Sequence, residues 1–61
     1  QTIHMEQIGV LMAAIKKLED CNLALKADSY RNPSRSVKNN ERIQKNESMI
    51  LDYKFRISQY K

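Results

Sequence analysis

Apolar side chains in the first half of the chain recur at alternating spacings of three and four residues. The positions in this register are Ile8, Leu11, Ile15, Leu18, Asn22 and Leu25. The spacing is typical of an α-helix with one apolar stripe, and Ile and Leu hold the two core positions of a heptad repeat. We therefore expect an amphipathic helix over about residues 3–28. A second stripe, of small residues, widens the apolar face in the way that suits a bundle. Its members are Val10, Ala14, Cys21 and Ala24.

Two residues of these stripes, Asn22 and Cys21, differ in chemistry from their apolar neighbours. Asn22 is the polar member of the heptad register. It is either a core residue that fixes register or oligomer state at a cost in stability, or an exposed residue with no such role. Under the first interpretation, replacing Asn22 by Leu or Ile should raise the stability of the folded state. It should also allow several oligomeric states instead of one. Cys21 lies on the stripe of small residues, so we expect it to be a buried free thiol.

The helical pattern is broken at Asn32-Pro33. Proline lacks the backbone N–H, clashes with the preceding helical turn, and disfavours the α region for the residue before it. Either the chain turns here, or Pro33 lies in the first turn of a second helix. Ser34 or Ser36 is expected to cap that helix through its hydroxyl.

The second helix is predicted over about residues 36–60. Its apolar stripe starts late, because residues 38–42 are polar and offer almost nothing to a core. In a hairpin, this polar start would face the apolar end of the first helix and leave a mismatch beside the turn. The stripe itself consists of Ile43, Ile50, Tyr53, Ile57 and Tyr60.

The sequence therefore predicts an all-α fold of two amphipathic helices, about 3–28 and 36–60, with a break near Asn32-Pro33. These helices are expected to associate as a coiled coil or a helical-hairpin bundle. A linker of about six residues suits an antiparallel hairpin. The alternative is a bent or interrupted parallel coiled coil in which copies pair throughout.

Association is favoured because the chain has only 61 residues. A domain of this size buries only about 60% of the surface of its unfolded chain, and it usually needs a disulfide, a metal or a partner. Cys21 is the single cysteine and His4 the single histidine, too few for an intrachain disulfide or a four-ligand zinc site. We expect residues 1–61 to be one helical oligomerisation module. Because it begins at Gln1 rather than Met, we expect it to be part of a longer protein.

The composition argues against an enzyme. Acid–base or nucleophilic catalysis needs paired groups in a sheltered pocket, and neither His4 nor Cys21 has a partner at a suitable spacing. We therefore predict no catalytic residues, no cofactor and no metal. No apolar run approaches 18 residues, so no membrane span is expected. The lone cysteine and the lack of signal-peptide features predict an intracellular protein, cytoplasmic or nuclear.

The second half of the chain is basic, with eight Lys or Arg against three acidic residues over 31–61. Some of these bases could follow the phosphates of a nucleic acid. The candidates are Arg31, Arg35, Lys38, Arg42 and Lys45. Aromatic residues near the C-terminus could stack on exposed bases. However, Tyr53 and Tyr60 lie on the apolar stripe, which predicts that they pack in the core instead.

The leading functional prediction is a coiled-coil scaffolding module that associates with itself, as a dimer or a tetramer. A helical adaptor that folds against a different helical protein is one alternative. A basic helical module that binds nucleic acid through residues 31–45 is another. The predicted protein interface combines the two apolar stripes. It consists of Ile8, Leu11, Ile15, Leu18, Asn22, Leu25, Ile43, Ile50, Tyr53, Ile57 and Tyr60.

Overall fold

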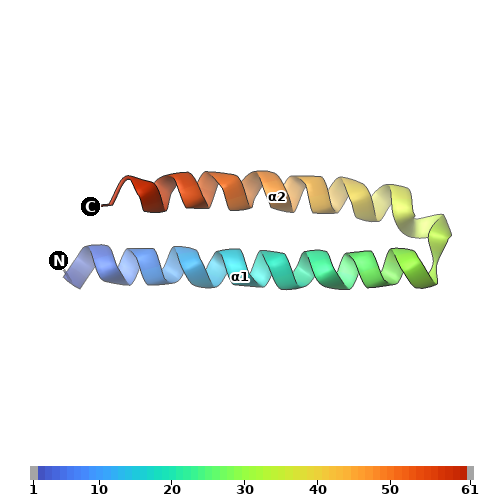
Figure 1. Ribbon diagram of the computed structural model, residues 1–61, viewed down its shortest axis with the longest axis horizontal. Coiled ribbons are helices and arrows are strands. Elements are labelled where there is room, and N and C mark those ends of the chain that lie inside the picture. Colours follow the sequence, from blue (N-terminus) through green and yellow to red (C-terminus); the bar gives the residue numbers. More distant parts are fainter. Residues whose placement is uncertain (1, 61) are drawn as a thin grey trace.

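The computed structural model is a hairpin of two antiparallel α-helices (Figure 1). It describes residues 2–60, with side chains from residue 4 onward. Helix α1 spans Thr2–Arg31, a 3₁₀ turn η1 spans Pro33–Arg35, and helix α2 spans Ser36–Ser58. The predicted all-α fold is confirmed, and of the two arrangements that the sequence left open, the structure has the hairpin. Both ends of the chain lie at the same end of the molecule, which is 48 Å long.

The turn is made where the sequence places the break. Helix α1 runs to Arg31, slightly beyond the predicted end at residue 28. Asn32 then leaves the helical conformation, with φ −130° and ψ 80°, because the following proline disfavours the α region. Pro33 opens η1, where its missing N–H matters little because first-turn donors have no partner within the helix. Helix α2 ends at Ser58, two residues before the predicted end at 60.

The predicted serine cap of α2 is wrong. Ser36 is the first residue of α2, Arg35 occupies the capping position, and no side chain bonds to the first turn. The backbone N–H of Ser36 instead donates to the carbonyl of Pro33. The 3₁₀ turn thus leads directly into α2 and satisfies one of the first-turn donors that have no partner within the helix.

The core is a single seam between the two helices. Ile15 at 8% exposure, Ile43 at 7% and Ile50 at 7% are its buried apolar residues. Flanking them are half-buried members of the two predicted stripes: Ile8, Leu11, Leu18, Leu25, Tyr53, Ile57 and Tyr60. No side chain in the described part of the chain is less than 2% exposed. Two helices share one interface, so the apolar stripes are covered from one direction only.

A polar pair interrupts this seam. Asn22 is 7% exposed, and its Oδ1 accepts a hydrogen bond of 2.9 Å from Nδ2 of Asn46 on α2. The first interpretation of Asn22, a buried core residue, is therefore the one that the structure has. A one-residue slip of either helix would separate the two amides, so the pair fixes which levels of α1 and α2 face each other.

A second polar cluster closes the seam beside the turn. Asn39 is 6% exposed, and its Nδ2 approaches Oδ2 of Asp28 at 2.8 Å, Oγ of Ser29 at 3.1 Å and the carbonyl of Leu25 at 3.3 Å. The sequence predicted that residues 38–42 offer almost nothing to a core, and Asn39 is the exception. The polar start of α2 was expected to be a poor match for the apolar end of α1. Asn39 removes this mismatch because its amide donates to polar groups at the end of α1.

Asp28 joins this cluster to the turn. The hydrogen bond from Asn39, together with those from Asn32 and the nearby Arg35 and Arg31 guanidinium groups, holds the pKa of Asp28 below its ordinary value of 3.8. The Asn32 amide lies 3.3 Å and the Arg35 guanidinium 3.5 Å from Oδ1 of Asp28. These contacts all favour the charged carboxylate.

Acid should therefore weaken the hairpin through Asp28. A pKa that is lower in the folded than in the unfolded chain gives a stabilisation that is complete above the ordinary pKa of 3.8. That stabilisation is lost as the pH falls through this value toward the lower folded pKa. Urea unfolding at several pH values between about 6 and about 2 should show this loss, and Asp28→Asn should diminish it. Asp20→Asn, on an exposed residue of α1, is the control. An acid response unchanged in Asp28→Asn would contradict the assignment.

Candidate interaction surfaces

The predicted interface residues lie inside the hairpin. All eleven are buried or half-buried in the seam between α1 and α2. The helix that covers each stripe is therefore the other helix of the same chain. A contact with a second protein would rest mainly on side chains outside this seam.

Large apolar side chains remain exposed on the outside of the hairpin. Their exposed fractions run from 59% at Met12 to 91% at Tyr30. Among the residues whose side chains the structure describes, they are Met5, Val10, Met12, Leu23, Tyr30, Val37, Leu51 and Phe55. A contiguous group of such residues on a surface marks a site of interaction, so their positions around the helices matter.

Four of them share one face of α1. Met5, Met12, Leu23 and Tyr30 follow each other at steps of seven, eleven and seven residues. At 3.6 residues per turn these steps are close to whole numbers of turns. The four side chains therefore form a line along α1, beside the seam and outside it. The heptad pattern of the seam obscured this line, although its spacing is visible in the sequence.

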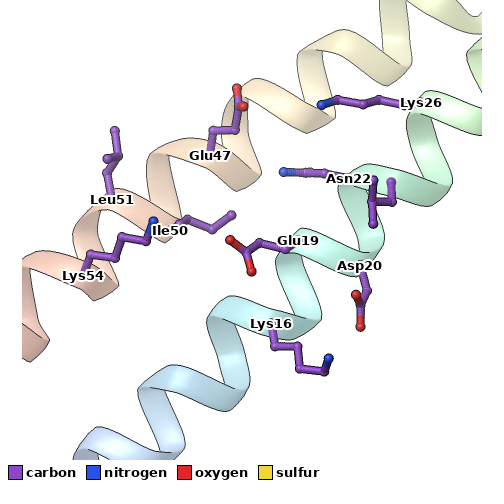
Figure 2. Close-up of a pocket in the computed structure, with 10 residues that line it drawn as sticks. Lys16, Glu19, Asp20, Asn22, Lys26, Glu47, Ile50, Leu51 and Lys54 are labelled. Atoms are coloured by element: carbon purple, nitrogen blue, oxygen red, sulfur yellow. The ribbon is translucent and has the colours of Figure 1, made fainter.

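Charged residues complete this face, and a groove runs along it between the helices (Figure 2). Glu19 and Ile50 project into the groove, and Leu51 lines it from α2. Lys16 and Asp20 lie along the outer side of α1. We call this surface the mixed face. It consists of Met5, Met12, Lys16, Glu19, Leu23 and Tyr30 of α1, with Glu47, Leu51 and Lys54 of α2.

A basic groove lies on the other side of the seam. Arg35, Lys38 and Arg42 line it from η1 and α2, and Cys21 and Ala24 line it from α1. The structure thus brings together three of the five predicted nucleic-acid contacts. Arg31 and Lys45 are exposed but lie outside the groove. The expected burial of Cys21 is wrong, because the small-residue stripe borders this groove and its thiol is exposed.

The basic groove is partly neutralised, and none of the described residues that line it is aromatic. Asp28 also lines it and pairs with Arg35 at 3.5 Å. Tyr53 and Tyr60 are half-buried in the seam, as predicted. The Tyr60 ring lies 5.3 Å from the His4 ring, and the Arg56 guanidinium lies 5.8 Å from the Tyr53 ring centre. Neither tyrosine is thus free to stack on a nucleic-acid base.

Within the part of the chain that the structure describes, no three side chains of His, Cys, Asp or Glu come together as metal ligands. Over the same residues, neither helix combines the length and the apolar character needed to cross a bilayer. The sequence matches no family model, no curated protein and no solved structure.

Proposed function

We propose that this chain is a non-enzymatic helical module whose function is to associate with a second copy of itself. The observation that carries the proposal is the exposed apolar line on α1, beside a seam in which three of the described apolar side chains are buried. A two-helix hairpin covers each helix from one side, so a second hairpin is the simplest way to bury the rest.

The exposed area supports the same proposal. The hairpin exposes 5148 Å². A compact folded chain of 7.2 kDa is expected to expose about 4,100 Å². The excess of about 1,000 Å² is close to the roughly 800 Å² that each partner buries in a standard interface. Association of two hairpins through one face would therefore bring the exposed surface near that of a compact domain.

The alternative functions have less support from the contacts. The basic groove contains a carboxylate, Asp28, and none of its described lining residues is aromatic. A heterologous partner would have to match a surface on which acidic and basic residues alternate, such as Lys16, Glu19, Glu47 and Lys54 of the mixed face. A surface with both signs of charge is suited to a second copy, because it supplies the complement of each charge itself.

Sedimentation equilibrium over a wide concentration range, at low and high salt, tests the proposal. We expect a dimer, or a tetramer at higher concentration, that persists in high salt because the contact is largely apolar. The melting midpoint should rise with protein concentration, since only the folded state associates. A monomer at every concentration, with a concentration-independent midpoint, would contradict the proposed function.

A further inference from the structure

Four exposed basic residues follow each other along one side of η1 and α2. They are Arg35, Lys38, Arg42 and Lys45, at steps of three, four and three residues. Steps of three and four keep side chains on the same side of a helix, so these residues form a basic row parallel to the axis of α2. The first three members line the basic groove, and Lys45 extends the row beyond it.

The hairpin does not neutralise most of this basic row. Arg35 pairs with Asp28 at 3.5 Å, and the other ion pair among the described residues lies near the C-terminal end of α2. Lys38, Arg42 and Lys45 thus have no acidic partner within the described part of the chain. Bases three or four residues apart on a helix repel each other, so the row lowers the stability of the hairpin. A negatively charged partner would remove this cost.

Short side chains form the α1 wall of the same groove. Cys21 and Ala24 line the groove and are exposed, and the stripe of small residues continues from them toward the chain ends through Ala14 and Val10. Helices approach each other as closely as the side chains between them allow. A third helix could therefore lie along the groove, with one edge against the short residues of α1 and the other against the basic row of α2.

We infer that the basic groove is a docking site for an acidic amphipathic helix of a different protein. The partner helix carries carboxylates at steps of three and four residues on the edge that faces the basic row. It carries small or apolar residues on the edge that faces Cys21 and Ala24. Docking completes a three-helix bundle in which Lys38, Arg42 and Lys45 gain acidic partners.

The sequence itself argues against a second copy as the occupant of this groove. The seven acidic residues of the chain nowhere stand three or four residues apart, so a second copy has no row of carboxylates to match the basic row. The groove also lies on the other side of the seam from the mixed face. This site therefore goes beyond the proposed self-association and does not depend on it.

Two features favour a helix over a nucleic acid in this groove. Asp28 lines the groove, and a nucleic-acid backbone, which carries a charge on every nucleotide, would place phosphates beside this carboxylate. A partner helix can place an uncharged side chain there instead. The described residues that line the groove also offer no aromatic ring on which an unpaired base could stack.

Fluorescence anisotropy with a labelled acidic peptide tests the site. The probe is a helical peptide of about three heptads, with glutamates at steps of three and four along one edge and alanine and leucine along the next. A control peptide has the same composition, with its glutamates spread around the helix. In low salt the 61-residue chain should bind the probe about tenfold more tightly than the control peptide. Equal affinities would reflect attraction by net charge alone and would overturn the inference.

Charge reversal in the basic row shows which residues make the contact. Lys38→Glu and Arg42→Glu should each weaken binding of the probe about fivefold, because each loses an ion pair and gains a repulsion. Both residues are exposed, so circular dichroism should show unchanged helix content. Lys26→Glu is the matched control, since it changes the net charge equally and Lys26 lines the groove on the other side of the seam (Figure 2). It should change the affinity less than about twofold, and an equal loss in all three variants would contradict the site.

Duplex DNA of random sequence is the competing probe. If DNA binds through Lys38 and Arg42 more tightly than the acidic peptide does, the groove is a nucleic-acid site and the inference is wrong. A chain that binds neither peptide in low salt would overturn it as well. Both outcomes leave the proposed self-association untouched, because sedimentation of the chain alone decides that question.

Discussion

Replacing Ile43 by alanine is expected to destabilise the hairpin by about 2–5 kcal/mol, the cost of deleting a buried aliphatic side chain. Ile43 is 7% exposed and is one of three buried apolar residues in the seam. A chain of 61 residues has a total stability of roughly 3–9 kcal/mol at about 0.05–0.15 kcal/mol per residue. The substitution should therefore remove most of that stability, because two helices have no neighbouring layer that can close around the cavity.

The measurement is urea unfolding followed by circular dichroism, at one fixed protein concentration. Val37→Ala is the control, since Val37 lies on the same helix and is 69% exposed. That substitution should change the free energy of unfolding by less than about 0.5 kcal/mol. A similar loss in the two variants would mean that the seam is not the part of the structure that holds the helices together.

Replacing Asn22 alone by leucine is expected to destabilise the hairpin by about 1–3 kcal/mol. The sequence alone predicts that this substitution raises stability. The structure predicts the opposite, because it shows that Asn46 is the hydrogen-bond partner of Asn22. Nδ2 of Asn46 donates to Oδ1 of Asn22 at 2.9 Å, and leucine would leave this donor half-buried and unpaired. Replacing both residues by leucine removes donor and acceptor together, so the double variant should be neutral or more stable than the original chain.

A double-mutant cycle of Asn22→Leu, Asn46→Leu and the combination measures this coupling. The double variant should also allow α1 and α2 to pack in more than one register, since the Asn22–Asn46 hydrogen bond fixes their register in the original chain. Sedimentation would then report a mixture of oligomers where the original chain gives one species. Additive single effects, with no coupling energy, would show that the amide pair does not contribute to the stability of the fold.

Periodicity was sufficient to predict both helices and the members of the seam, because a helix that buries one face has to repeat near 3.6 residues. It could not predict that the chain folds back, since Asn32-Pro33 permits either a turn or a bent continuation. The hairpin is favoured by contacts far apart in sequence. Asn39 reaches Asp28 and Ser29 across the turn, and nothing in the local pattern marks Asn39 as different from its polar neighbours.

The candidate surfaces were harder to predict than the fold. The eleven residues predicted as a protein interface are buried or half-buried in the seam, where they pack within the chain. The mixed face could be recognised only after the seam was assigned, because its members are those that the other helix leaves uncovered. The predicted burial of Cys21 was wrong for the same reason. Cys21 and Ala24, two members of the small-residue stripe, line the basic groove rather than the core.

The position of the two chain ends has a mechanical consequence. In one hairpin they lie together at one end of a rod 48 Å long. Any segments joined to the two ends would therefore leave the hairpin side by side, at the end opposite the Asn32-Pro33 turn. The hairpin would hold its turn away from those segments by about the length of the helices, and the number of helical turns sets that distance.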